Sequence, residues 1–297
     1  MGRLTDRAPT QIEVCVLDFD GTLSLLRRGW ESVMMALFLD RLAMEAPPDQ
    51  ATRDELDRYI HASAGLQTIL QMEWFSRYLH GRFPDSTQPE DPWFFKDRYN
   101  ERLMDVVGRR IRDAQDAGGR ECTRVASGTG GASGTEGAGA SGIPGVAGWL
   151  VPGALAFLQA LRAAKVRCCI ASGTDHEDVL REAALLGVLD LVSEVRGAPR
   201  RSRECSKEAL VRGLLEDAPG VPERIAVVGD GRVEIEVARR YGALALGIAS
   251  DEENPGRLNV AKRDRLVRAG ADRLVPDFTE LPAILDWMGL GSSVGGG

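Results

Sequence analysis

Two aspartates near the N-terminus stand where a predicted strand ends, and their chemistry calls for an explanation. Asp18 and Asp20 follow the largely apolar run Ile12–Leu17 and are separated only by Phe19. Side chains alternate along a strand, so both carboxylates would leave its end on the same side. Two like charges held close together raise the free energy unless a cation or a proton lies between them. The spacing therefore favours a cation-binding site, although Asp and the following Gly21 are also common turn residues.

Further polar residues stand at the ends of other predicted strands or at the start of a helix. Ser172 and Gly173 end one strand, Asp230 ends another with Glu234 one helical turn further, and Lys207 opens a helix. In an open α/β sheet, ligands bind at the carboxyl ends of the strands. We therefore expect these side chains and the two aspartates to meet at one rim of a sheet.

The residue types at this rim suit a phosphate ester bound beside a metal ion. Carboxylate oxygens are ligands that Mg²⁺ prefers, whereas a hydroxyl, an ammonium group and backbone amides suit the charge of a phosphoryl group. One carboxylate would act as nucleophile, and the other as general acid and then as base. Each residue alone has a structural alternative as a turn residue or helix cap. Their common placement at strand ends favours the chemical interpretation.

The elements that would position these residues alternate between strand and helix. From residue 151 onward, short apolar runs alternate with segments of helical periodicity, which is typical of a parallel sheet covered on both faces. The opening strand has the same character, so we predict an α/β core domain made of residues 1–23 and 150–290. The predicted strands after the first are 166–174, 189–195, 223–231 and 243–250, and the predicted helices are 151–164, 175–187, 206–216 and 232–242.

Residues 24–117 differ from this core because they contain no comparable strand. Apolar residues recur there at helical spacing, which predicts an inserted all-helical cap domain whose Met and aromatic side chains form its own core. Residues 118–149 are rich in Gly, Ser, Ala and Thr and predict a flexible linker. Residues 291–297 predict a disordered tail.

The amino-acid composition argues against several classes of binding partner. The net charge of -7 argues against general binding to nucleic acid or to an anionic membrane. No run approaches the roughly 18 apolar residues of a membrane span, and no secretory signal core is present, so we predict a cytoplasmic protein. The five cysteines lack metal-site spacing and indicate reduced thiols. A monomer and a homodimer both remain open.

Four ordered motifs resemble those of the haloacid dehalogenase superfamily of phosphohydrolases. They are DFDGTL, ASGT, Lys207 and GDGRVEIE, and the segment AGADRLVPDFTEL is similar to the last strand and helix of these proteins. The resemblance covers residues 12–22 and 150–285 and is most specific in the first and fourth motifs. It implies a Rossmann-like core, a mobile helical cap and dependence on Mg²⁺.

The resemblance also implies a role for each motif residue. Asp18 would be the nucleophile and a metal ligand, and Asp20 would be the acid and base that lends its backbone carbonyl to the metal. Asp230 would ligate Mg²⁺, and Glu234 would do so directly or through water. The phosphoryl group would be bound by Thr22, Ser172, Gly173 and Lys207.

Two departures from the family pattern bear on substrate binding. Members often carry an Asp soon after DGTL, whereas this chain continues SLLRRGW, so Arg27, Arg28 and Trp30 are candidate substrate contacts. An amphipathic helix start with solvated arginines is the alternative. Lys207 is followed by Glu208 rather than by Pro, which leaves Arg200, Arg201 and Arg203 as competing cations of the third motif.

Asp20 and the distribution of lysines narrow the chemistry within this superfamily. Dehalogenating members lack the second aspartate of the first motif, and phosphonate-cleaving members need a cap lysine, whereas the only Lys in residues 24–117 is Lys96. We therefore predict Mg²⁺-dependent hydrolysis of a small phosphomonoester, such as a sugar phosphate or a phosphoglycolate-like acid. A sugar-phosphate mutase and a non-catalytic phospholigand-binding protein on the same fold remain alternatives.

Overall fold

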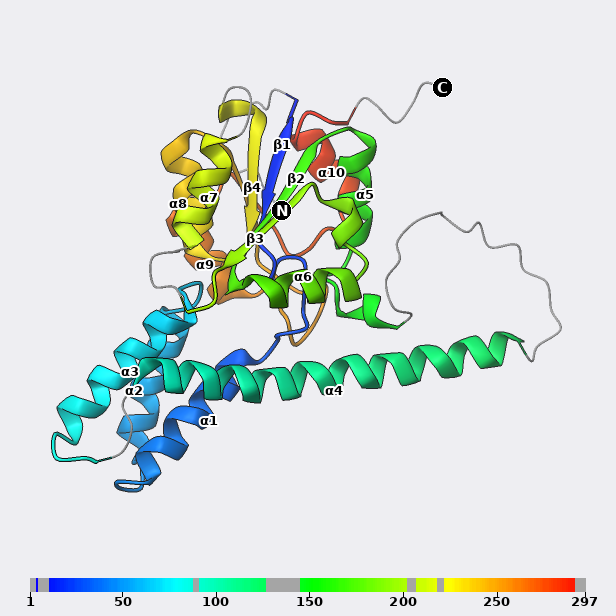
Figure 1. The fold of residues 1–297 in the computed structure, drawn as a ribbon. Coiled ribbons are helices and arrows are strands. Elements are labelled where there is room, and N and C mark those ends of the chain that lie inside the picture. The colour runs from blue at the N-terminus through cyan, green and yellow to red at the C-terminus, as the bar shows by residue number, and fades with distance from the viewer. Residues whose placement is uncertain are drawn as a thin grey trace.

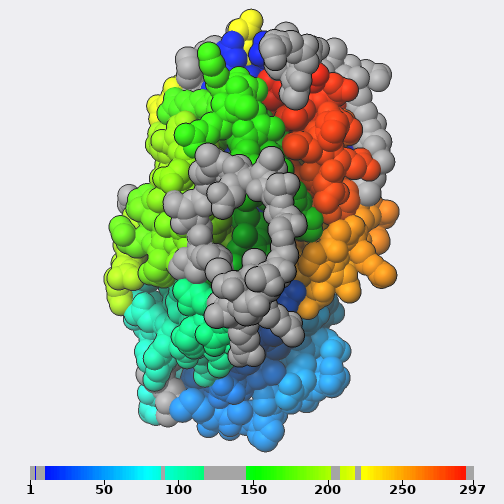
Figure 2. Space-filling model, turned by 90° about the vertical axis from the view of Figure 1, so that its right-hand side faces the viewer, coloured from blue at the N-terminus to red at the C-terminus, as the bar shows by residue number. Residues whose placement is uncertain are grey.

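The computed structural model describes residues 4, 11–87, 91–126, 145–201, 207–217 and 222–291. Side chains at 117–126 and 207 lie outside that description. Within it, a sheet domain stands above a set of helices (Figure 1). In Figure 2 the blue to cyan helices form the lower end of the molecule, and the green, orange and red core forms the upper end.

The core is a six-stranded parallel sheet in the order β3-β2-β1-β4-β5-β6. This arrangement confirms the predicted α/β, Rossmann-like fold. The central strand is β1, whose last residue, Leu17, lies opposite Ile170 of β2 and Val228 of β4. The residues that follow β1 and β4 therefore lie side by side, next to the last residues of β2. The strands are β1 (Val14–Leu17), β2 (Arg167–Asp175), β3 (Glu194–Ala198), β4 (Ile225–Gly229), β5 (Leu244–Ile248) and β6 (Arg273–Val275).

Helices cover both faces of the sheet (Figure 1). Cys15 and Leu17 of β1 pack into the apolar cluster on one face, whereas Val14 and Val16 pack into the cluster on the other. A strand buried on both faces is expected to be apolar along its length, which explains the unbroken run VCVL. One face carries α5 (Ala154–Ala163), α6 (His176–Leu185) and α10 (Leu281–Trp287), and the other carries α7 (Lys207–Glu216), α8 (Arg232–Tyr241) and α9 (Val260–Ala269).

The segment between β1 and the rest of the core is helical. Its helices are α1 (Trp30–Ala43), α2 (Gln50–Ala62), α3 (Thr68–Arg82) and α4 (Pro92–Ala126). Phe38 of α1 stacks on Phe75 of α3 with ring centroids 3.9 Å apart, and Met34 and Met72 are fully buried beside them. The apolar residues at helical spacing thus form a core of this cap. None of the described helices is both long enough and apolar enough to cross a membrane.

Three elements differ from the sequence-based predictions. The third strand is residues 194–198, because the predicted segment 189–195 begins with a 3-10 turn over Leu189–Leu191. Helix α9 was not predicted, since its sequence VAKRDRLVRA buries only Leu266 and Ala269. Helix α4 continues to Ala126 and a 3-10 turn occupies Val146–Trp149, so both enter the predicted linker 118–149. Residues 127–144 and the predicted tail beyond Gly291 lie outside the described residues.

Cysteines in the described strands are buried, as their apolar surroundings predicted. Cys15, Cys168 and Cys169 are free thiols in neighbouring strands β1 and β2. Burial raises the pKa of all three thiols. They therefore act as small apolar residues of the sheet.

Candidate active site

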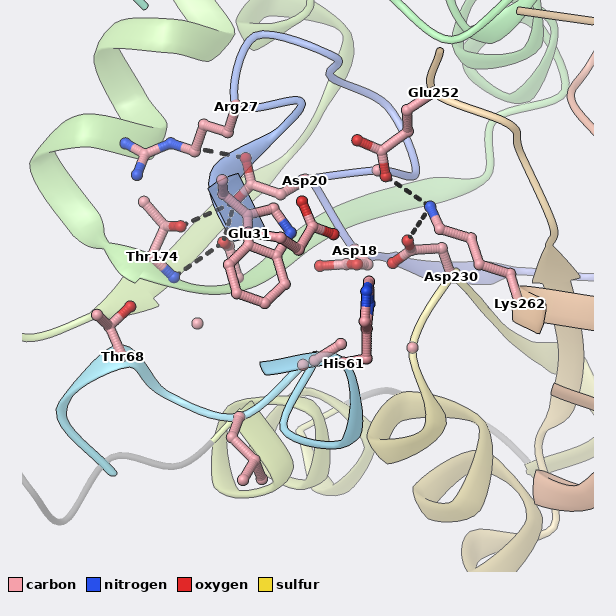
Figure 3. A pocket seen from close by; sticks show the side chains of 18 of the residues that line it. Asp18, Asp20, Arg27, Glu31, His61, Thr68, Thr174, Asp230, Glu252 and Lys262 are labelled. Carbon is pink, nitrogen blue, oxygen red and sulfur yellow. Dashed lines mark hydrogen bonds and ion pairs between the residues drawn. The ribbon is translucent and has the colours of Figure 1, made fainter. Parts of the chain in front are cut away.

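A cavity of about 270 Å³ lies between the carboxyl ends of the strands and the helical cap (Figure 3). Its core wall contains Asp18, Asp20, Ser172, Gly173 and Asp230. The structure therefore brings together residues from the first, second and fourth motifs, which lie far apart in sequence. Ligand pockets in proteins usually measure about 300–1,000 Å³, so this cavity suits a small molecule.

The turn after β1 places Asp18 against the fourth motif. Gly21 has a positive φ of 75°, and a Cβ added to it would lie 2.4 Å from Asp230 Oδ2. A residue with a side chain would meet both left-handed backbone strain and a clash, so glycine is required at this position. The glycine lets the chain turn back while Asp18 stays beside Asp230.

Thr22 has a different neighbour from the one that the family resemblance implies. Its side chain is fully buried and does not line the cavity. Its Oγ1 donates a hydrogen bond to Asp18 Oδ2 at 3.2 Å. Thr22 therefore orients the Asp18 carboxylate instead of facing the position predicted for a phosphoryl group.

Two hydroxyl groups from the end of β2 hold the carboxylate of Asp20. Thr174 Oγ1 donates to Asp20 Oδ2 at 2.8 Å, and Ser172 Oγ donates to the same oxygen at 3.4 Å. Gly173 lies between them and lines the cavity, and a Cβ added there would meet no atom within 4 Å. Thr174 belongs to the ASGT motif but was not assigned a role from sequence. The strand pairing between β1 and β2 explains why it reaches Asp20.

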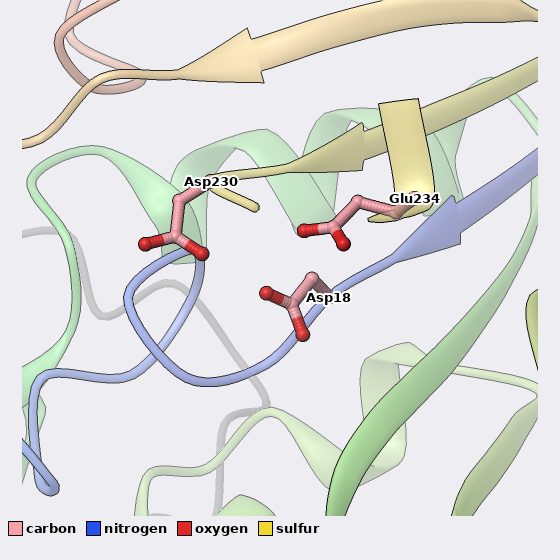
Figure 4. A group of neighbouring side chains, drawn as sticks. All are labelled: Asp18, Asp230 and Glu234. Carbon is pink, nitrogen blue, oxygen red and sulfur yellow. The ribbon is translucent and has the colours of Figure 1, made fainter. Parts of the chain in front are cut away.

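Three carboxylates form a group that could hold a metal ion (Figure 4). Oxygen atoms of Asp18, Asp230 and Glu234, one from each, all lie within 4.8 Å of one another. Glu234 is buried and its Oε1 accepts a hydrogen bond from Gly231 N at 2.7 Å, which fixes it at the start of α8. A Cβ on Gly229 would lie 2.3 Å from Glu234 Cγ, so glycine makes room for this side chain. Hard oxygen donors in this number fit Mg²⁺. The carboxylate of Asp20 is not part of the group.

Lys262 is a neighbour of this group that sequence reasoning missed. Its Nζ lies 2.6 Å from Asp230 Oδ2 and 2.6 Å from Glu252 Oε1. Burial acts to lower the pKa of Lys262, but Asp230 and Glu252 raise it overall. Lys262 lies in the first turn of α9, where Asn259 caps the helix by accepting a hydrogen bond from the Lys262 backbone N–H. The sequence does contain a pattern that would have pointed to this lysine: a helix-capping residue, Asn259, follows the predicted strand 243–250 and precedes a helix that carries Lys262.

The predicted cation of the third motif is only partly described. Lys207 begins α7, as predicted, but its side chain lies outside the described residues. Of its predicted competitors, Arg201 is exposed and pairs with Asp97 at 2.6 Å, whereas Arg203 also lies outside the described part of the chain. Lys262 is therefore the lysine that the described structure places beside the carboxylate group.

Arg27, a predicted substrate contact, is instead buried among acidic side chains of the core. Its Nη2 lies 2.7 Å from Glu182 Oε1 and 3.5 Å from Asp178 Oδ2, and its Nε lies 3.7 Å from Asp20 Oδ1. Burial acts to lower the pKa of Arg27, but the three carboxylates raise it overall. Although Arg27 touches the cavity wall, its guanidinium group ties the chain after the first motif to α6 and lies beside Asp20.

The other two predicted substrate contacts have different surroundings. Trp30 lines the cavity at the start of α1. Arg28 does not line it; its Nη1 donates to the Glu252 carbonyl oxygen at 3.1 Å and its guanidinium lies 5.3 Å from the centroid of the Trp149 ring. Arg28 faces an adjacent depression instead. Of the three predicted substrate contacts, Trp30 is therefore the one that lines the cavity without being tied to the core by an ion pair.

Fold and site together define a capped α/β enzyme with an acidic centre at the ends of its strands. A family model for haloacid dehalogenase-like hydrolases matches residues 12–242 of this sequence. The chain therefore belongs to the haloacid dehalogenase-like hydrolases, which confirms the family predicted from the four motifs and the prediction that it is an enzyme. No curated protein matches the sequence.

Solved structures share the fold at low sequence identity. A protein described as a predicted phosphoglycolate phosphatase from Haemophilus somnus 129PT is 17% identical, with a TM-score of 0.54 over 93% of this chain and 98% of its own. β-Phosphoglucomutase from Clostridium difficile is 10% identical, with a TM-score of 0.58 over 94% of this chain and 97% of its own. CbbY from Rhodobacter sphaeroides, solved with phosphate, is 15% identical, with a TM-score of 0.51 over 91% of this chain and 96% of its own. These similarities concern the fold alone.

Proposed function

We propose that this protein is a Mg²⁺-dependent phosphomonoester hydrolase that acts on a small phosphorylated metabolite through an aspartyl-phosphate intermediate at Asp18. The proposal rests mainly on one observation: the two aspartates of the first motif lie in different surroundings. Asp18 lies in the carboxylate group with Asp230 and Glu234, whereas Asp20 is held by the hydroxyls of Thr174 and Ser172. Different surroundings suit different chemical roles for two carboxylates.

The first half of the reaction transfers the phosphoryl group to the protein. An oxygen of Asp18 attacks phosphorus, and the bond between phosphorus and the leaving oxygen breaks. Asp20, as general acid, gives its proton to that leaving oxygen, so the product departs as an alcohol. Mg²⁺ held by Asp18, Asp230 and Glu234 would neutralise negative charge on the phosphoryl oxygens.

The second half releases phosphate and restores both carboxyl groups. Asp20, now a carboxylate, takes a proton from water while the water oxygen attacks phosphorus and the bond to Asp18 breaks. Thr174 and Ser172 hold Asp20 in one orientation through both halves, and Thr22 does the same for Asp18. These hydrogen bonds reduce the reorganisation that proton transfer and attack would otherwise need.

The test is phosphate release from a panel of phosphorylated metabolites before and after removal of divalent cations. Wild-type protein should release phosphate only when Mg²⁺ is restored, and the Asp18→Asn variant should release none above background. Asp40→Asn is a matched control, because Asp40 is exposed on α1 and pairs with Arg102 at 2.7 Å, away from the cavity. Release that persists without metal, or in Asp18→Asn, would contradict the proposed mechanism.

A phosphomutase is the second candidate, because the structures that share the fold include a β-phosphoglucomutase as well as a protein described as a predicted phosphatase. A mutase would return the phosphoryl group to a second hydroxyl of the sugar instead of giving it to water. The two reactions are separated by following one sugar phosphate: isomer conversion without net phosphate release identifies the mutase, and free phosphate identifies the hydrolase.

A further inference from the structure

The cap wall of the cavity differs in charge from the core wall. Among the described residues from α1 to α4 that line it, none is a lysine or an arginine, and the single carboxylate is Glu31. Arg27 precedes α1 and is paired with Glu182 of the core. The other polar groups on this wall are neutral side chains and a histidine whose side chain is largely exposed. They include Trp30, His61, Thr68, Gln71 and Tyr99.

The cations that line the cavity all stand on the core side and already have acidic or carbonyl neighbours. Arg27 is paired with carboxylates of α6 and lies beside the first motif. Lys262 lies 2.6 Å from Asp230 Oδ2, and Arg265 Nη2 donates to the Asp230 carbonyl oxygen at 3.3 Å. Lys262 and Arg265 are thus placed at the end of the cavity where Asp18 would receive the phosphoryl group. A second anionic group reaching toward the cap would find Lys262 already paired with Asp230 and Glu252, and Arg27 with Glu182.

Glu31 is the strongest polar feature of the cap wall. It lies in the first turn of α1, is half-buried, and faces the cavity together with His61 in Figure 3. Within the described part of the chain its carboxylate accepts no hydrogen bond from another residue and forms no ion pair. Burial and the nearby Glu252 carboxylate raise the pKa of Glu31, against a smaller lowering by its own backbone N–H, Lys262 and His61. A poorly hydrated acceptor in a cavity wall suits a ligand that donates a hydrogen bond.

We propose that the alcohol part of the substrate carries no second anionic group and presents a hydroxyl or ammonium donor to Glu31. The substrate class is then the phosphate ester of an amino alcohol or a small polyol, rather than a phosphorylated acid or a bisphosphate. This inference rests on the proposed phosphatase function. A carboxylate or second phosphate at this position would stand against Glu31, and Lys262, which acts on Glu31, is already paired with Asp230 and Glu252. Like charges brought together in an interface are strongly disfavoured.

The test uses three esters of nearly equal size that differ in one terminal group: phosphoethanolamine, ethylene glycol monophosphate and phosphoglycolate. The wild-type protein should have a kcat/KM for the ammonium and hydroxyl esters at least about tenfold above that for phosphoglycolate, which corresponds to about 1.4 kcal/mol. Comparison of the first two esters shows whether charge or hydrogen bonding is recognised. Equal or preferred turnover of phosphoglycolate would overturn the inference.

The variant Glu31→Gln assigns the preference to this residue. It keeps the size of the side chain and removes its charge, so the ratio between the ammonium ester and phosphoglycolate should fall about tenfold, mainly through KM. Asp40→Asn on the same helix should leave the ratio unchanged. An unchanged ratio in Glu31→Gln would overturn the assignment, provided that the thermal melting of the variant matches wild type.

Hydrolysis of p-nitrophenyl phosphate separates this inference from the proposed function. If wild-type protein hydrolyses it in an Asp18-dependent way while the ester preference is reversed, the phosphatase stands and the inference fails. If wild-type protein hydrolyses neither p-nitrophenyl phosphate nor any of the three esters, the proposed function fails and the inference falls with it.

Discussion

Core and cap form opposite walls of the same cavity, and the two walls are built in different ways. Most of the core wall comes from residues just beyond β1 and β4 and from the last residues of β2, which parallel pairing places side by side. The segment after β5 adds Lys262 and Arg265. The cap wall includes residues at the starts and ends of different helices, such as Glu31, Thr68 and His61, which no common periodicity aligns. In the proposed mechanism, the sheet side therefore supplies the reacting groups, and the helices supply the groups that contact the rest of the substrate.

Removal of the proposed acid should produce the largest loss among the variants that leave the nucleophile in place. Asp20→Asn removes the proton that the leaving alcohol needs, so kcat should fall about 10²–10⁴-fold for alkyl phosphates. In the first half of the reaction the loss should be much smaller for p-nitrophenyl phosphate, whose leaving group departs without a proton. The rate of the first turnover on both substrates, measured by rapid mixing, checks this prediction. An equal loss in that first turnover on both would mean that Asp20 does not act as the acid for the leaving group.

A substitution of Arg27 tests whether the junction between core and cap depends on a buried ion pair. Arg27→Met leaves Glu182, only 1% exposed, without its cation, and should lower the free energy of unfolding by about 3–5 kcal/mol at neutral pH. Arg28→Met is the control, since that side chain is more exposed and should cost less than about 1 kcal/mol. Urea unfolding of the two variants measures the difference.

The pH dependence of the same variant gives a second check. Burial already raises the pKa of Glu182, and loss of Arg27 should raise it further. A group whose pKa is raised in the folded state favours folding below its unfolded pKa and loses that contribution as pH rises. The deficit of Arg27→Met should therefore shrink as pH falls toward about 4, where unfolded Glu titrates. A loss in the free energy of unfolding that does not change with pH would contradict the claim that the loss comes from the unpaired Glu182 carboxylate.

The same substitution at two threonines, one on the core wall and one on the cap wall, compares the two walls directly and should have the smallest effects. Thr174→Val removes the 2.8 Å hydrogen bond to Asp20 and should lower kcat about tenfold, a value in line with a hydrogen bond to a charged group. Thr68→Val makes the same change on the cap wall, so it should alter KM for the preferred ester with little effect on kcat. Similar effects of both variants on kcat would remove the division between a reaction wall and a recognition wall.

The meeting of Asp18 and Asp230 could be predicted from the sequence because each directly follows a strand. Asp18 and Asp230 meet as expected, since a parallel register fixes where β1 and β4 end. Lys262 was missed because its helix is too polar to show a clear period, and its approach to Asp230 depends on the path of the chain after β5. The role of Arg27 was predicted wrongly because its neighbours in the sequence give no sign of the acidic side chains of α6 that surround it in the fold.

The most direct test of the central claim is detection of a phosphoryl group on Asp18 during turnover. Protein mixed with a phosphomonoester and Mg²⁺ is quenched in acid and reduced with borohydride, which converts an acyl phosphate to the side chain of homoserine, and the peptide that contains residue 18 is then analysed by mass spectrometry. The structure predicts that this conversion occurs at Asp18 alone and disappears without substrate. Continued phosphate release with no modification at Asp18, or modification at Asp20 instead, would contradict it.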